Sequence, residues 1–298
     1  MDLVLTLVAP PNAGAFSVNL REVFASVGAR GKESRQLDAG DGAATDVILE
    51  AQDAALVRTA LEAPMADQQL DWCLQPLEGR RKRLLVADMD STIINVECLD
   101  EIADFAGLKA EISALTERAM RGELAFDGAL RERVAMLKGL PVEALQRAYD
   151  ERVRLNPGAR TLVRTMAANG ARCVLVSGGF SFFTQRVAAA AGFQAERGNT
   201  LHDRDGMLTG EVGEPILGRE AKLAALTEEA EALGLPLSAT MAVGDGANDL
   251  AMIQAAGLGV AYRAKPIVAA QADAQVTHAD LTALLYFQGY SKDDFVTD

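Results

Sequence analysis

Three short apolar runs that each end in a polar residue limit most strongly what this chain can fold into. They are LLVAD (84–88), CVLVS (173–177) and TMAVGD (240–245), and helical stretches separate them. Continuous apolar runs of this length are typical of strands buried on both faces of a parallel sheet. The alternation of strands and helices therefore predicts an α/β fold with a right-handed, doubly wound parallel sheet.

Residues of about 99–155 break this alternation, because they show helical periodicity without a clear strand. Gly and Pro divide them into four predicted helices, so we expect a helical insertion that forms a closing cap. After Pro157 the alternation resumes. The further predicted elements are helices at about 158–168, 180–191, 218–233 and 247–255, a Gly-rich hairpin at about 193–213, a strand at LGVA (258–261) and short helices beyond it.

The first 76 residues show a different order, in which two helices alternate with four strands. This βαββαβ order matches a ferredoxin-like α+β module, with an antiparallel sheet and both helices on one face. The predicted elements are strands at about 3–9, 34–38, 44–51 and 69–75 and helices at about 14–27 and 53–64, with Gly40, Asp41 and Gly42 in the central hairpin.

Two domains are therefore expected, residues 1–77 and residues 78–298, and a length of 298 residues also favours two. EGRRKR (78–83) is interpreted as the linker between them. Its four consecutive basic residues predict a solvated surface patch rather than a specific anion site.

The chain carries 29 Lys and Arg residues against 42 Asp and Glu residues, which gives a net charge of −13. A surface this acidic repels nucleic acids and anionic lipids, so neither class of partner is expected. A small anionic substrate would need cations at its own site, from Lys, Arg or a metal ion.

The three cysteines, Cys73, Cys98 and Cys173, show no CxxC spacing, so neither a disulfide framework nor a zinc site is indicated. The N-terminal MDLVLTLVAPP has no basic region and ends in two prolines, which is unlike a signal peptide. No apolar run of 18 residues occurs elsewhere. A cytoplasmic location is expected.

In doubly wound sheets the ligand binds beyond the carboxyl ends of the strands, where Asp88, Ser177 and Asp245 are predicted to converge. Asp88 alone is equally consistent with a helix cap. Together with Asp90, however, it supplies the nucleophile and the general acid and base that hydrolysis through an acyl phosphate requires. Two carboxylates beside a phosphate also require a hard cation, so we expect Mg²⁺ on Asp88, Asp245 and the main-chain carbonyl of Asp90.

Ser177 is followed by Gly178 and Gly179, and a hydroxyl beside unobstructed backbone N–H groups suits phosphate oxygens. SGG is also typical of an ordinary turn from strand to helix. Lys222 in REAKLAAL is a candidate cation for the phosphate and Asp88, although most helical lysines are surface residues.

These motifs resemble the haloacid dehalogenase superfamily, whose signatures appear in the same order as DMDST (88–92), SGG (177–179), Lys222 and GDGAND (244–249). Within it, the chain is similar to the phosphoserine phosphatases over about 85–298. The matching stretches are DMDSTIINVECLDEIA (88–103), MRGELAFDGALRERVAMLKGLP (120–141) and VGDGANDLAMI (243–253).

The resemblance implies a role for each matched residue. Asp88 is the expected nucleophile and Asp90 the general acid and base, with Asp88, Asp90 and Asp245 as Mg²⁺ ligands. The expected substrate-binding residues are Glu97 and Arg133 for the serine moiety and Ser177, Gly178 and Lys222 for the phosphate, with Asn248 and Asp249 supporting the site.

Arg133 and Glu97 have side chains of the right chemical type for phosphoserine, since its carboxylate suits a guanidinium and its ammonium group suits a carboxylate. Arg131 is an equal candidate by chemistry, and Glu97 is also consistent with a surface charge. Phe126 and Met120 are expected either in an apolar wall of the site or in the core.

The expected activity is hydrolysis of O-phospho-L-serine to L-serine and phosphate, the last step of serine biosynthesis. Two alternatives are a phosphotransferase or phosphatase for another small metabolite, and a non-catalytic amino-acid sensor. Residues 1–77 resemble the regulatory ACT domains of amino-acid enzymes, so an amino-acid effector or a homodimer is a further expectation.

Overall fold

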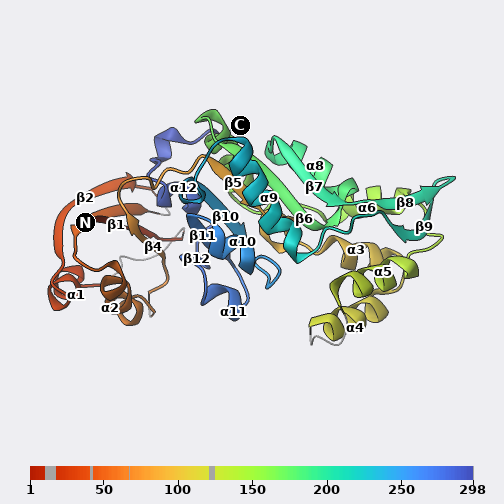
Figure 1. The fold of residues 1–298 in the computed structure, drawn as a ribbon, viewed down its shortest axis with the longest axis horizontal. Coiled ribbons are helices and arrows are strands. Elements are labelled where there is room, and N and C mark those ends of the chain that lie inside the picture. The colour runs from red at the N-terminus through yellow and green to blue at the C-terminus, as the bar shows by residue number, and fades with distance from the viewer. Residues whose placement is uncertain (11–17, 41–42, 67, 121–124, 298) are drawn as a thin grey trace.

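The computed structural model describes residues 1–10, 18–40, 43–66, 68–120 and 125–297 (Figure 1). Ten strands of these residues form one continuous sheet, in which an antiparallel half passes directly into a parallel half. In order across the sheet they are β2 (Arg30–Asp38), β3 (Ala44–Glu50), β1 (Asp2–Val8), β4 (Asp71–Pro76), β12 (Ala274–Val276), β11 (Leu258–Tyr262), β10 (Thr240–Gly244), β5 (Leu84–Ala87), β6 (Arg172–Phe180) and β7 (Ala195–Asn199).

The antiparallel half has the predicted ferredoxin-like topology, since β1 lies between β3 and β4 and pairs with both in antiparallel register. Helices α1 (Leu20–Ser26) and α2 (Ala54–Ala66) cover one face, where Phe24, Val57 and Leu61 share a core with alternate apolar residues of β1. The first residues of the helix predicted at about 14–27, and Asp41 and Gly42 of the predicted hairpin, lie outside the described residues.

Helices cover both faces of the parallel half, which confirms the predicted doubly wound arrangement. Because side chains alternate along a strand, Leu84 and Val86 of β5 face one core while Leu85 and Ala87 face the other. The first core includes residues of α9 (Arg219–Ala232), α10 (Leu250–Ala255) and α11 (Pro266–Ala269), and the second includes residues of α7 (Ala159–Ala168), α8 (Ser181–Ala191) and α12 (Ala283–Phe287).

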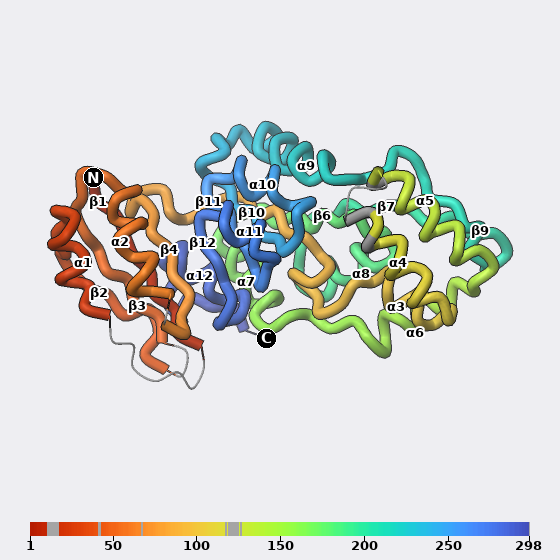
Figure 2. Tube along the Cα trace, turned by 90° about the horizontal axis from the view of Figure 1, so that it is seen from below, coloured from red at the N-terminus to blue at the C-terminus, as the bar shows by residue number. Residues whose placement is uncertain are grey.

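The predicted four-helix insertion lies at the far end of the molecule from residues 1–77 (Figures 1 and 2). Its helices are α3 (Cys98–Phe105), α4 (Lys109–Met120), α5 (Phe126–Met136) and α6 (Glu143–Arg152). The hairpin of β8 (Leu201–Arg204) and β9 (Met207–Val212) reaches this cap, where Leu208 N–H donates to the Leu140 carbonyl (2.9 Å).

The prediction of one Gly-rich hairpin over about 193–213 was wrong for its first part. Residues 195–199 form β7, the parallel edge strand, and only β8 and β9 make the hairpin. The reason is α8, a helical crossover from β6 that returns the chain parallel to β6.

Buried polar contacts join the two halves, in addition to an apolar core that contains residues of both. The Asp71 carboxylate at the start of β4 accepts backbone N–H groups of Thr277, His278 and Ala279, the shortest at 2.7 Å. Burial raises the pKa of Asp71, and these backbone donors oppose the rise. Strand pairing across the junction consists of Trp72 with Gln275.

The basic linker packs more tightly than the predicted solvated patch. Arg80 forms an ion pair with the buried Asp46 (2.8 Å), and buried Lys82 donates to the Ser238 carbonyl (2.8 Å). Arg81 and Arg83 are exposed as predicted. The prediction was wrong for Arg80 and Lys82 because their partners lie far away in sequence.

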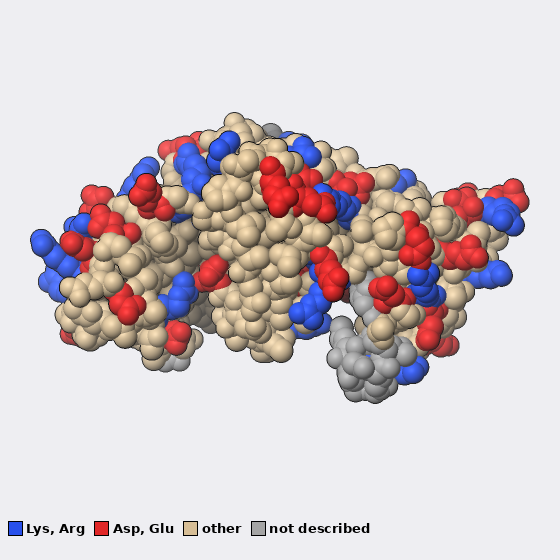
Figure 3. All heavy atoms as spheres, in the orientation of Figure 1, with Lys and Arg blue, Asp and Glu red and all other residues tan. Residues whose placement is uncertain are grey.

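On the face shown in Figure 3, basic side chains lie among acidic ones over both ends of the molecule. Among the helices of the described residues, none combines the length and the apolar character needed to cross a membrane.

Candidate active site

Asp88 follows the buried strand β5 at the carboxyl edge of the sheet. Its N–H donates to the Val243 carbonyl of β10 (3.0 Å), so the strand pairing continues up to the carboxylate. A tight turn over Met89–Ile93 then reverses the chain, and Ile94 N–H closes it on the Met89 carbonyl (3.0 Å). This turn places Asp90 beside Asp88.

Asp90 is held from two sides. Its Oδ1 accepts the N–H of Cys98 at the start of α3 (3.0 Å), and its Oδ2 accepts the hydroxyl of Ser177 (3.3 Å). Burial, followed by repulsion from Glu97, raises the pKa of Asp90 to about 7. A carboxyl group that titrates near neutral pH can donate and accept a proton in turn, as a general acid and base must.

Lys222 of α9 joins two of the carboxylates. Its ammonium group lies 2.5 Å from Asp88 Oδ1 and 2.5 Å from Asp249 Oδ1, with all three side chains buried. Burial lowers the pKa of Lys222, but Asp249 and Asp88 outweigh it and raise that pKa overall. Lys222 is therefore charged, and it contacts Asp88 directly.

Asp88, Asp245 and Asp249 present carboxylate oxygens within 4.8 Å of one another. Asp249 is already engaged, since Oδ1 binds Lys222 and Oδ2 accepts the N–H groups of Asp245 (3.1 Å) and Gly246 (2.9 Å). Asp88 and Asp245 keep oxygens for a cation, and burial followed by Asp249 raises the pKa of Asp245 to about 6. This all-oxygen, negatively charged set fits Mg²⁺.

The SGG segment at the end of β6 lies against Asp90. Ser177 Oγ accepts the N–H of Gly179 (2.8 Å), and a Cβ on Gly179 would come within 2.9 Å of Asp90 Oδ2. Gly at position 179 thus permits the close approach of the two segments.

Asn199 at the end of β7 forms hydrogen bonds that hold the SGG segment in place. Its Nδ2 donates to the carbonyls of Gly178 (2.8 Å) and Leu217 (3.2 Å), and its Oδ1 accepts the Leu217 N–H (2.7 Å). Leu217 leads into α9, so one buried amide connects the SGG segment to the helix that carries Lys222.

Both glycines of the GDGAND segment leave space that a side chain would fill. A Cβ on Gly244 would lie 2.4 Å from Asp249, and one on Gly246 would lie 2.3 Å from Asn248 Oδ1. The turn therefore brings Asn248 and Asp249 back beside Asp245.

The predicted serine-binding residues come from the cap side. Arg133 is half-buried on α5, where Nε donates to the Ala129 carbonyl (3.1 Å) and the guanidinium to Thr116 Oγ1 (3.3 Å). Burial lowers the pKa of Arg133, and Asp100 and Glu97 oppose this. Arg131, the other candidate, is exposed and pairs with Glu214.

Glu97 is exposed at the start of α3, and its Oε1 accepts the hydroxyl of Ser91 (2.6 Å). The side chains of Met120 and Phe126, predicted for an apolar wall, lie outside the described residues.

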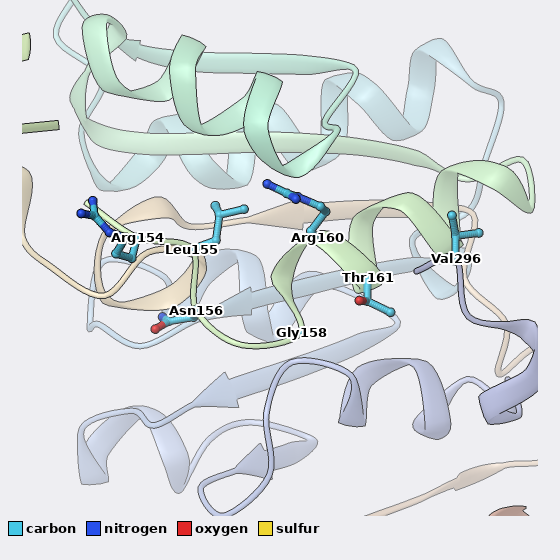
Figure 4. A pocket seen from close by; sticks show the side chains of 7 residues that line it. All are labelled: Arg154, Leu155, Asn156, Gly158, Arg160, Thr161 and Val296. Carbon is cyan, nitrogen blue, oxygen red and sulfur yellow. The ribbon is translucent and has the colours of Figure 1, made fainter. Parts of the chain in front are cut away.

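A cavity of about 320 Å³, which none of these carboxylates lines, lies at the return of the chain from the cap (Figure 4). Its two arginines are already engaged, since Arg154 donates to the Val153 carbonyl (2.7 Å) and Arg160 to the Ala190 carbonyl (3.0 Å). The lining residues are Arg154, Leu155, Asn156, Gly158, Arg160, Thr161 and Val296.

Sequence reasoning missed three polar residues around the site. Ser91 and Thr92 lie inside the DMDST motif, and Thr92 Oγ1 donates to Asp245 Oδ1 (3.4 Å). The only sequence signal for Asn199 is its position near the end of a short strand. That strand was not recognised, because residues of about 193–213 were predicted as one hairpin.

Comparison with known proteins places this architecture in a family. Residues 85–254 match the family model of the haloacid dehalogenase-like hydrolases. A phosphoserine phosphatase of Archaeoglobus fulgidus is 44% identical over 240 residues, which cover 80% of this chain and 70% of that protein.

Two solved structures extend the comparison. A HAD family hydrolase from Salmonella enterica serovar Typhi superposes with a TM-score of 0.84 at 29% identity, over 96% of this chain and 98% of that one. A substrate-bound phosphoserine phosphatase superposes with a TM-score of 0.65 at 38% identity, over 70% of this chain and 98% of that one.

Proposed function

This chain belongs to the haloacid dehalogenase-like hydrolases, and we propose from this premise that it hydrolyses O-phospho-L-serine to L-serine and phosphate with Mg²⁺. The observation that carries the proposal is the convergence of Asp88 and Asp90 with Ser177 and Lys222, which come from three separate segments of the chain. Relatives that are 41–48% identical and named phosphoserine phosphatases support the choice of substrate.

The first step uses both acids of the turn. A carboxylate oxygen of Asp88 forms a bond to phosphorus while the bond from phosphorus to the serine oxygen breaks. Asp90, which titrates near neutral pH, donates its proton to the departing serine oxygen. Lys222 and the N–H group of Gly178 would stabilise the charge on the phosphoryl oxygens.

The second step reverses the role of Asp90. The ionised Asp90 takes a proton from a water molecule as the water oxygen bonds to phosphorus, and the bond to Asp88 breaks to release phosphate. Mg²⁺, held by Asp88, Asp245 and the main-chain carbonyl of Asp90, would neutralise charge on the phosphate and the carboxylates.

Glu97 and Arg133 are the residues that we assign to the serine moiety. Glu97 would bind the ammonium group and Arg133 the carboxylate group of the substrate. Arg133 suits this better than Arg131, because it is half-buried and held by Thr116, whereas Arg131 is exposed and paired with Glu214.

The test measures phosphate release from a panel of phosphorylated metabolites, with Mg²⁺ or with EDTA. We expect O-phospho-L-serine to give the highest kcat/KM and EDTA to abolish turnover. Asp88→Asn should abolish turnover of every substrate, because it removes the nucleophile. A near-normal rate for Asp88→Asn would contradict the assignment of Asp88 as the nucleophile. A higher kcat/KM for another phosphoester would contradict the assignment of O-phospho-L-serine as the substrate.

A further inference from the structure

The backbone of Ser91 is unusual for a residue with a side chain. It has φ +56° and ψ −2°, in the left-handed region that glycine adopts without strain. Strained residues are found preferentially at functional sites, where the surrounding structure over-determines them. Ser91 lies between Asp90 and Thr92, inside the turn that carries the catalytic acids.

In the left-handed conformation, the side chain of Ser91 points toward Glu97. The turn brings Ser91 opposite the start of α3, where Ser91 N–H donates to the Val96 carbonyl (3.3 Å). The Ser91 hydroxyl then donates to Glu97 Oε1 at 2.6 Å. Glu97 makes no side-chain hydrogen bond as the N-cap of α3, so its carboxylate is directed to Ser91 rather than to the helix.

The same segment connects Glu97 to the reacting groups. Cys98, the next residue, donates its N–H to Asp90 Oδ1 (3.0 Å), so the two acids are fixed on one short stretch of chain. Glu97 is exposed, and an exposed Glu side chain without a partner samples several rotamers. A hydroxyl that fixes its carboxylate reduces this freedom before the substrate binds.

We infer that Ser91 is a positioning residue for substrate specificity, whose hydroxyl holds the Glu97 carboxylate where the ammonium group of the substrate binds. The inference rests on the proposed function, because it assigns Glu97 to the ammonium group. It adds that recognition of this group depends on a strained residue that does not itself touch the substrate. A purely structural role for Ser91 would affect all phosphoesters alike.

The experiment compares O-phospho-L-serine with 3-phosphooxypropanoate, which lacks only the ammonium group. The ratio of the two kcat/KM values measures recognition of that group. We expect Ser91→Ala to lower the ratio about tenfold, mainly through the KM of phosphoserine, since a hydrogen bond to a charged group is lost. Ser26→Ala is the matched control, because Ser26 donates to the Val23 carbonyl far from the site.

Two further variants separate positioning from loop stability. Ser91→Gly relieves the left-handed strain, so it should melt at or above the temperature of Ser91→Ala while its ratio falls equally. In a Glu97→Gln background, Ser91→Ala should produce no further fall, because the group that it positions has lost its charge.

A wild-type ratio in both Ser91 variants would overturn the inference, and so would equal losses on the two substrates or an additive effect in the Glu97→Gln background. If the wild-type enzyme itself does not prefer phosphoserine to 3-phosphooxypropanoate, the proposed function fails instead. The two failures are therefore distinguishable.

Discussion

At the scale of single residues, the site is a set of charges that depend on one another. Lys222 lies between Asp88 and Asp249, and Asp249 in turn binds two backbone N–H groups of the GDGAND turn. Asp90 is held by Cys98 and Ser177. Each acid thus has a different set of partners, which is why adjacent carboxylates can take different roles.

Replacing Lys222 by Met tests this dependence. The variant leaves Asp88 and Asp249 buried without their cation, so we expect the free energy of unfolding to fall by about 3–5 kcal/mol. Turnover should fall at least about a thousandfold, because charge stabilisation at the phosphoryl group is lost. Urea unfolding and phosphate release measure the two effects.

Lys109→Met is the control for this variant, because Lys109 is exposed at the start of α4. It should change the free energy of unfolding by less than about 0.5 kcal/mol. A similar loss in both lysine variants would show that the buried ion pairs contribute nothing beyond an average surface charge.

Arg133→Ala tests recognition of the substrate carboxylate. We expect the KM for phosphoserine to rise about ten- to a hundredfold, while hydrolysis of p-nitrophenyl phosphate, which has no carboxylate, changes little. Arg131→Ala should leave both substrates near wild-type values, since Arg131 is exposed and paired with Glu214. Equal losses on both substrates would favour a phosphatase for another metabolite.

At the scale of helices and strands, sequence patterns correctly predicted the elements that depend mainly on interactions between residues close together in the chain. Continuous apolar runs identified β5, β6 and β10, and the acids that follow them located the site at the carboxyl edge of the sheet. The cap was predicted as four helices because Gly and Pro separate the amphipathic stretches.

Contacts between residues distant in sequence account for what local patterns could not predict. Lys82 was interpreted as solvated, although it binds the Ser238 carbonyl, which lies 156 residues away. The 195–199 stretch carries no sign that it pairs with β6 rather than with its neighbour. Ser91 looks like an ordinary turn residue until its dihedral angles are known.

Asp71 is the clearest element-scale example, because it joins β4 to the loop after β12. Asp71→Ala removes an acceptor from three backbone N–H groups, so we expect the free energy of unfolding to fall by about 2–4 kcal/mol. Asp53→Ala, which removes an exposed cap of α2, should cost only about 1 kcal/mol. Chemical denaturation of both variants makes the comparison.

Equal losses of unfolding free energy in Asp71→Ala and Asp53→Ala would contradict this expectation, since they would mean that the junction contributes no more than a surface cap.

The division of the chain into residues 1–77 and 78–298 stays a prediction, as does an amino-acid effector or a homodimer at residues 1–77.

At the scale of the whole molecule, a net charge of −13 must coexist with a site that binds a phosphate dianion. Burial raises the pKa of Asp245 to about 6 and that of Asp90 to about 7 in the metal-free protein. The folded state therefore binds these protons more tightly than the unfolded chain does. Without metal, their contribution to stability is greatest at low pH and is lost as pH rises through about 6 to 7.

Magnesium should reverse this dependence, because it binds the ionised carboxylates. At pH 5 the ion must displace the proton from Asp245, one of its carboxylate ligands, whereas at pH 7.5 that group is mostly ionised. We expect Mg²⁺ to raise Tm more at pH 7.5 than at pH 5, with a stabilisation of about 2.7 kcal/mol when it is present at a hundred times its Kd. Differential scanning calorimetry measures both shifts.

Two controls separate binding at the site from screening of the net charge. NaCl at matched ionic strength screens surface repulsion without occupying an oxygen site, so it should give a small shift at both pH values. Asp245→Asn should remove most of the Mg²⁺ shift at pH 7.5, because it deletes a charged ligand. A shift that is equal at both pH values, or that survives Asp245→Asn, would mean that Mg²⁺ acts on the acidic surface rather than at the strand ends.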